Sequence, residues 1–199
     1  MNEKSPTENI IVADADYVDT VAFDLTVNFE RMLNRRIPLA DMAQWTECVA
    51  LDGGMKEGEQ QQTHVILIHD REQPAMKNFT PGRYADELHG QAFRGRLGEF
   101  VFTAVQTEAM VTKEDLLADT LEAVCQQEGL RRLMVVADDH QLNALRPLLR
   151  RLDSDELRTT IFTMQPMQGG AFRHELLGFS LLAALGISSS EIEEKLNRQ

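Results

Sequence analysis

The chain has 199 residues, of which 43% are hydrophobic and 26% are charged, and its formal net charge is −12. This composition is that of an ordinary globular protein and argues against disorder outside the termini. The negative charge excludes a general nucleic-acid binder, because an acidic surface repels phosphate backbones. RNA contact would need a local basic patch or bridging metal ions.

The length and termini favour one domain in a reducing compartment. We expect a flexible leader over residues 1–8 and a single α/β domain over residues 9–199. The two cysteines are too few and too far apart for a disulfide framework or a zinc knuckle. The leader lacks the basic start and apolar core of a signal peptide, and the longest apolar stretch is too short to span a bilayer. These features predict a cytoplasmic protein without membrane contact.

Apolar runs alternate with amphipathic segments along the chain. The predicted strands cover residues 10–13, 64–68, 100–105, 133–137 and 160–164. The predicted helices cover residues 17–34, 38–52, 81–93, 112–129, 141–152 and 172–185, followed by a short charged helix capped by Ser188. This alternation predicts right-handed crossovers, and therefore a three-layer α/β/α, Rossmann-like fold with a mostly parallel sheet of about five strands.

Carboxylates gather where these strands end. They are Asp14 and Asp16 after the first strand, Asp70 beside His69 after the second, Asp115 and Asp119 at a helix start, and Asp138 and Asp139 after the fourth strand. Parallel strands present their carboxyl ends at one edge of the sheet, which is where such sheets bind ligands. Carboxylates that converge repel one another, and a bound Mg²⁺ or Mn²⁺ relieves the repulsion. The pattern therefore indicates metal-assisted phosphoryl chemistry.

A structural interpretation of each carboxylate stays open. Asp14 ends a buried strand, so it needs hydrogen-bonding partners whether or not it binds a metal. The other carboxylates also fit helix caps, turns or a solvent-facing stripe: Asp16, Asp115, Asp119, Asp138 and Asp139.

In the order of its elements, the chain resembles the PIN-like and NYN nucleases over roughly residues 9–165. That family has an aspartate at the end of its first strand, an acidic helix start before its fourth strand, and a strand that ends in Ser-Gly-Asp-x-Asp-Phe. Asp14 matches the first feature, and Asp115 or Asp119 matches the second. For the third, Asp139 stands at the first aspartate of the motif, and Gln141 replaces its second aspartate.

The resemblance implies a PIN-like fold and a divalent-metal-dependent nuclease that acts on RNA at a local site. Asp14 and Asp139 would be catalytic, and they would hold Mg²⁺ or Mn²⁺ together with Asp115 or Asp119. The metal would generate a hydroxide that attacks a phosphodiester. Because Gln141 departs from the motif, the hypothesis includes a degenerate, inactive descendant.

A second resemblance is to the haloacid-dehalogenase-like phosphatases. Asp14-Ala15-Asp16-Tyr17-Val18 resembles their first motif, which implies that Asp14 is the phosphorylated nucleophile and Asp16 the general acid. Lys113 resembles their later lysine, and Asp138 with Asp139 resembles their paired acid. His69 and Asp70 stand where that family has a serine or threonine.

A third hypothesis is a non-catalytic α/β module that binds a partner. The apolar helix expected to begin at Phe172 and end at Leu185 would then form a homodimer contact, because it is hydrophobic on most sides. The chain also resembles an uncharacterised bacterial family, which would imply no particular activity.

Overall fold

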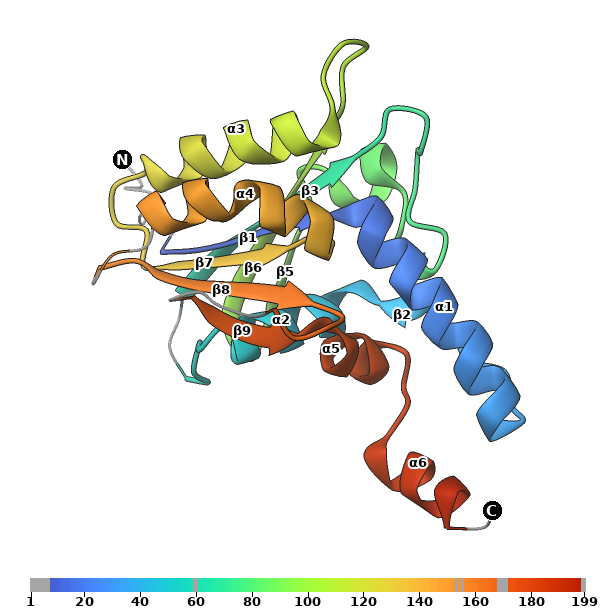
Figure 1. Ribbon diagram of the computed structural model, residues 1–199. Coiled ribbons are helices and arrows are strands. Elements are labelled where there is room, and N and C mark those ends of the chain that lie inside the picture. Colours follow the sequence, from blue (N-terminus) through green and yellow to red (C-terminus); the bar gives the residue numbers. More distant parts are fainter. Residues whose placement is uncertain (1–7, 59–60, 153, 155, 168–171, 198–199) are drawn as a thin grey trace.

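The computed structural model describes residues 8–58, 61–152, 154, 156–167 and 172–197, so most of the expected leader lies outside the described residues. Within these ranges, one sheet contains seven strands, which are β1 (Asn9–Asp14), β3 (Gln61–His69), β5 (Ala92–Gly95), β6 (Gly98–Gln106), β7 (Arg132–Val136), β8 (Arg158–Thr163) and β9 (Arg173–Leu176). Their order is β5-β6-β3-β1-β7-β8-β9, and only β5 runs antiparallel to its neighbour (Figure 1). Two short strands, β2 (Ala40–Asp41) and β4 (Phe79–Thr80), pair separately.

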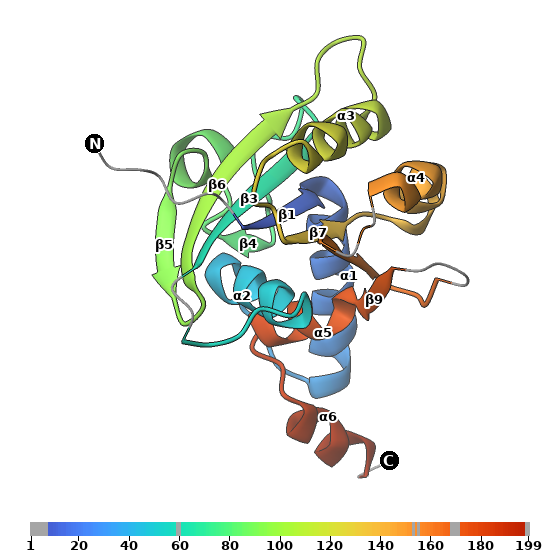
Figure 2. The same ribbon diagram turned by 90° about the vertical axis from the view of Figure 1, so that its left-hand side faces the viewer.

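Helices cover both faces of the sheet (Figure 2). The described helices are α1 (Ala15–Leu33), α2 (Met42–Asp52), α3 (Lys113–Cys125), α4 (Asp139–Leu152), α5 (Leu177–Ala184) and α6 (Ser189–Leu196), with a five-residue π-helical turn, η1 (Tyr84–Leu88). The last of them, α6, packs against α1 and not on the sheet. The expected helix over residues 38–52 begins only at Met42, because residues 40–41 form β2. Among the described residues, none of the helices combines the length and the apolar character that crossing a membrane requires. The predicted α/β class with a mostly parallel sheet is confirmed.

The central strand β1 divides the core into two clusters. Ile11 and Ala13 pack in the cluster that α1, α2 and α5 cover, whereas Ile10 and Val12 pack in the cluster under α3 and α4. This alternation follows from the two-residue period of a strand. All six residues of β1 are buried between its parallel neighbours β3 and β7. The strand therefore delivers Asp14 to the middle of the carboxyl edge of the sheet.

The sheet has seven strands instead of the expected number of about five, because β5 and β9 are added at its two edges. The predicted helix over residues 81–93 is wrong, because this segment contains only the turn η1 and then enters β5. Gly90, with a φ of 75°, breaks the segment, since a positive φ does not continue a right-handed helix. β5 pairs with β6 as an edge hairpin, and Phe93 stacks on Phe100 with ring centroids 4.8 Å apart.

The predicted helix over residues 172–185 is wrong in its first half. Arg173 begins the edge strand β9, which pairs with β8, and the helix α5 starts only at Leu177. The polar sequence Arg-His-Glu suits an exposed edge, whereas Leu177 and Leu181 are fully buried. One apolar face of α5, which carries Leu177 and Leu181, packs inside the chain against α2, whereas Phe179 of the same helix is 68% exposed.

Candidate functional site

A cavity of about 440 Å³ opens where β1 and β7 end. Its lining is mostly carboxylate, with one ammonium group, and we call it the acidic cavity. The residues that line it are Asp14, Asp16, Tyr17, Thr20, Asp70, Lys113, Glu114, Asp138 and Gln141. It lies at the edge where open parallel sheets bind ligands.

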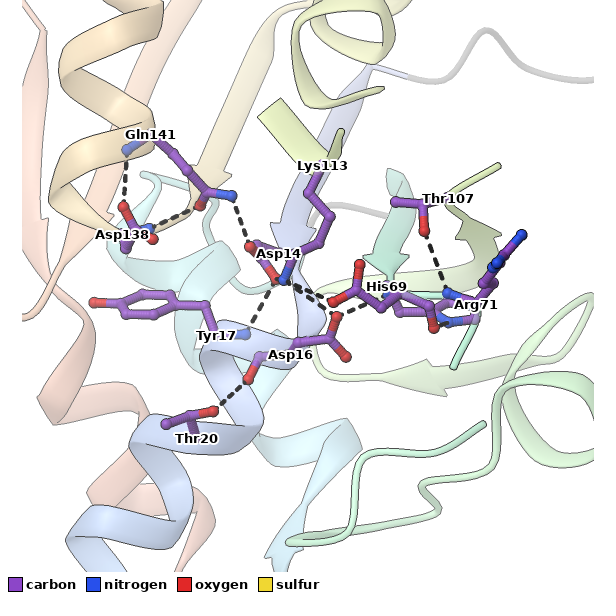
Figure 3. Close-up of polar contacts among 11 residues, drawn as sticks. Asp14, Asp16, Tyr17, Thr20, His69, Arg71, Thr107, Lys113, Asp138 and Gln141 are labelled. Carbon is purple, nitrogen blue, oxygen red and sulfur yellow. Dashed lines mark hydrogen bonds and ion pairs between the residues drawn. The ribbon is translucent and has the colours of Figure 1, made fainter. Parts of the chain in front are cut away.

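Lys113 lies at the centre of the carboxylates. Its Nζ is 3.1 Å from Oδ1 of Asp14 and 3.2 Å from Oδ2 of Asp16. Oδ2 of Asp70 is 3.8 Å away. Lys113 is the first residue of α3, and its side chain points from that helix toward the end of β1 (Figure 3). One ammonium group therefore neutralises carboxylates from β1, the start of α1 and the loop after β3.

Asp14 has hydrogen-bond partners on both carboxylate oxygens. Oδ1 accepts from the backbone N–H of Tyr17 at 3.1 Å, which caps α1, and also contacts Lys113. Oδ2 accepts from Nε2 of Gln141 at 2.8 Å (Figure 3). The side chain of Asp14 is only 3% exposed. Burying a carboxylate is costly unless its oxygens are paired in this way.

Gln141 is itself held in place by Asp138. The backbone N–H of Gln141 donates to Oδ1 of Asp138 at 2.8 Å, and the backbone N–H of Asp138 donates to Oε1 of Gln141 at 3.3 Å. These two bonds orient the amide so that its N–H₂ group faces Asp14. Gln141 is 4% exposed, so it is a buried part of the site rather than a surface residue.

The pKa values of Asp16 and Lys113 shift for opposing reasons. Burial is the largest influence on Asp16 and raises its pKa, although the N–H of Asp70, which donates to Oδ2 at 2.8 Å, and the charge of Lys113 act against it. Burial lowers the pKa of Lys113, but Asp14 and Asp16 together outweigh burial, so this pKa is raised. Burial therefore decides the direction for Asp16, with a small further contribution from the charge of Asp14, whereas the two carboxylates decide it for Lys113.

A protein-family model matches residues 3–192, and its description is a family of unknown function (DUF6621). The chain belongs to this family. No curated protein and no solved structure matches the chain. The match to DUF6621 runs from before β1 into α6, so the acidic cavity lies wholly inside the family region.

In this DUF6621 chain, the predicted site residues divide into two groups. Asp14, Asp16 and Asp138 line the acidic cavity, as does Asp70. The remaining three are not among the lining residues: Asp115, Asp119 and Asp139. Asp115 and Asp119 are exposed on α3. Oδ2 of Asp115 accepts from Oγ1 of Thr112 at 2.7 Å, within the predicted cap.

Asp139 lies at the start of α4, half-buried, and its Oδ1 atom is buried without a hydrogen-bond partner in the part of the chain that the structure describes. Burial is the largest cause that raises the pKa of Tyr17 to about 12, and the charge of Asp139 adds to it.

Sequence reasoning missed Glu114 and the structural role of Gln141. The signal for Gln141 is its spacing, because a residue three positions after Asp138 is where an aspartate cap finds its N–H donor.

The donor set does not fit a resident Mg²⁺ or Mn²⁺ ion. Among the described residues, no group of three or more His, Cys, Asp or Glu side chains is placed to hold a metal. The ammonium of Lys113 already occupies the space between Asp14 and Asp16, and the amide of Gln141 donates to the other oxygen of Asp14. A divalent cation would compete for the same oxygens and would be repelled by the lysine.

Proposed function

We propose that this chain is a three-layer, PIN-like domain that works as a metal-independent binding module, a degenerate relative of the metal-dependent nucleases. The observation that carries the proposal is the position of Lys113, whose Nζ contacts Asp14 and Asp16 at 3.1 and 3.2 Å. In such a site the lysine supplies the positive charge that Mg²⁺ or Mn²⁺ would otherwise supply. Gln141 supports the proposal, because it gives Asp14 a hydrogen-bond donor where the nuclease motif has an aspartate.

The charge that remains after this neutralisation defines the partner. Lys113 is one positive charge among five lining carboxylates, so the acidic cavity keeps a negative excess. The side chains of Asp70 and Glu114 are each 47% exposed, and they present this charge at the mouth of the cavity. A negatively charged cleft attracts cations and repels phosphates. We infer that the partner group is an ammonium or guanidinium group, as in a basic peptide segment.

Calorimetric titration with Mn²⁺ tests the metal-independent part of the proposal. We expect no saturable binding to the wild-type protein at millimolar metal, whereas Lys113→Met exposes the carboxylates and gains binding. The double variant Asp14→Asn/Lys113→Met should lose it again, and Lys56→Met, at an exposed lysine, should behave as wild type. Mn²⁺ binding to the wild type that disappears in Asp14→Asn would instead support the metal-dependent nuclease.

Titration with a fluorescent octalysine peptide tests the partner. The double variant Asp70→Asn/Glu114→Gln should weaken binding by about tenfold, which corresponds to the loss of two partly desolvated ion pairs. The matched control is Asp119→Asn/Glu122→Gln, which removes the same charge from the exposed side of α3. Equal weakening in both double variants would mean that peptide binding depends only on the net charge of −12 and not on the acidic cavity.

The phosphatase remains a second candidate, because one contact favours it. Lys113 lies against Asp14, as the resemblance to that family implies for its lysine and nucleophile, and the raised pKa of Asp16 suits a general acid. This hypothesis requires an aspartyl-phosphate at Asp14. Trapping with beryllium fluoride, followed by ¹⁹F NMR, tests it: a bound signal that Asp14→Asn abolishes would favour the phosphatase over the binding module.

A further inference from the structure

A second cavity, of about 350 Å³, lies on the other side of the segment that follows β3. Its walls come from the end of β3, the turn η1 and the last part of β6. We call it the aromatic cavity, and its polar lining consists of His69, Arg71, Gln73, Tyr84, His89 and Gln106. Pro74, Ala85 and Ala104 complete the wall with apolar surface.

The charge of the aromatic cavity is opposite to that of the acidic cavity. No carboxylate is among its lining residues in the described part of the chain, although the protein carries a net charge of −12. Arg71 supplies a guanidinium group, and the amides of Gln73 and Gln106 supply further N–H donors. Arg71 pairs with Glu72 at 3.3 Å, but the two side chains are 51% and 80% exposed, so solvent screens this pair and a ligand can replace it.

Tyr84 is a buried polar group on the wall of this cavity. The residue is 3% exposed, and its ring stacks on that of His69 with centroids 3.8 Å apart and planes 9° from parallel. Its hydroxyl has no hydrogen-bond partner among the described residues. Burial, ahead of the nearby carboxylates of Asp16 and Asp19, raises the pKa of Tyr84, so the hydroxyl keeps its proton. The hydroxyl oxygen is itself buried and lies near the carboxylates of the acidic cavity, so Tyr84 contributes its ring rather than a hydrogen-bond donor to the lining of the aromatic cavity.

We propose that the aromatic cavity binds a small organic anion, with a carboxylate or phosphate group held by Arg71 and the side-chain amides of Gln73 and Gln106, and an apolar body against Pro74 and Ala85. The ligand class follows from the lining, because guanidinium and amide N–H donors recognise oxyanions and the apolar wall excludes water from the remainder of the ligand. This site goes beyond the proposed function and does not depend on it, since none of its lining residues belongs to the acidic cavity.

Calorimetric titration of the full chain with benzoate and with phenyl phosphate tests the proposal. Saturable binding of at least one of the two is expected, and the tighter probe identifies the anionic group. Arg71→Gln should weaken binding by about tenfold, the effect of losing a charge-assisted hydrogen bond. Tyr84→Phe should leave binding unchanged, because the hydroxyl is buried and does not contact the ligand. Arg83→Gln is the matched control, because Arg83 is an exposed arginine at the start of η1 that does not line the cavity.

Three results would overturn the proposal. The first is the absence of saturable binding of either probe at about 10 mM, the limit of a weak specific site. The second is equal binding of neutral benzyl alcohol, which would mean that the cavity does not select an anion. The third is equal weakening by Arg83→Gln and Arg71→Gln, which would assign the binding to general surface charge.

Discussion

Two cavities lie on either side of the end of β3, and they differ in whether the chain supplies hydrogen-bond partners for their buried polar groups. Asp70 lines the acidic cavity, while its neighbours His69 and Arg71 line the aromatic cavity. In the acidic cavity, the buried carboxylate of Asp14 has donors from three parts of the chain. In the aromatic cavity, the buried hydroxyl of Tyr84 has none in the described residues. The chain therefore satisfies the buried acceptor Asp14 of the acidic cavity, whereas it supplies no acceptor for the buried hydroxyl of Tyr84 beside the aromatic cavity.

The largest expected effect comes from removing the cation of the acidic cavity. Lys113→Met leaves Asp14 buried without its counter-charge, and we expect a loss of about 3 kcal/mol in the free energy of unfolding, as for other broken buried ion pairs. Asp14→Asn/Lys113→Met should lose clearly less, because neither charge is then left unpaired. Urea unfolding measures both. A Lys113→Met protein as stable as wild type would show that the acidic cavity does not depend on its lysine.

An intermediate effect is expected for the amide that completes the pairing of Asp14. Gln141→Ala removes the donor 2.8 Å from Oδ2, and we expect a loss of about 2 kcal/mol, because a buried carboxylate oxygen is left unsatisfied. The control is Asn143→Ala on the same helix, where the side chain is exposed and accepts only from Arg146. Equal losses in the two variants, measured by urea unfolding, would mean that helix α4 rather than the contact with Asp14 is responsible.

A smaller, pH-dependent effect is expected at Asp16. Its pKa is raised in the folded protein above 3.8, so its contribution to stability is complete below pH 3.8 and is lost as the pH rises through the raised value. Asp16→Asn does not titrate, so its stability should improve relative to wild type as the pH rises through this range. Unfolding curves at several pH values give the difference. A difference that does not change with pH would show that Lys113 fully compensates the burial of Asp16.

The smallest effect on stability is expected for the hydroxyl of Tyr84 beside the aromatic cavity. Tyr84→Phe removes a hydroxyl without a partner, so the free energy of unfolding should change by less than about 0.5 kcal/mol, or increase. Urea unfolding without added ligand measures this. A loss comparable to that of Gln141→Ala would reveal that the hydroxyl is paired in the folded protein, and the two cavities would no longer differ in this respect.

The central part of the fold was predictable, and its margins were not. The continuous apolar run of β1 is typical of a strand buried on both faces. The strand, and with it the position of Asp14 at its end, could therefore be predicted from the local sequence. β5 and β9 have four residues each, Ala-Phe-Arg-Gly and Arg-His-Glu-Leu, and such short segments carry too little pattern to be recognised as strands. Edge strands of this kind are specified by pairing with β6 and β8, which local sequence does not contain.

The candidate site was predictable at the level of strand ends only. Whether Lys113 or Asp115 faces β1 depends on the rotation of α3 about its axis, and tertiary packing fixes that rotation. The bond from Lys113 to Asp14 joins residues 99 positions apart, and the bond from Gln141 joins residues 127 positions apart. Such distant pairs leave no local pattern, so the choice between a metal site and a lysine-neutralised site required the fold.

The position of β1 in the sheet has a consequence for folding. The six residues of β1 are synthesised before the other strands of the sheet, yet one of its two neighbours, β7, begins only at Arg132. Contacts between such distant segments carry a large loop-closure entropy and slow the folding reaction. During synthesis β1 can pair with β3 first, and Asp14 stays accessible to water until Lys113 and Gln141 have emerged. The charge network therefore assembles late, after two-thirds of the chain is available, and its formation reports the completion of the central sheet.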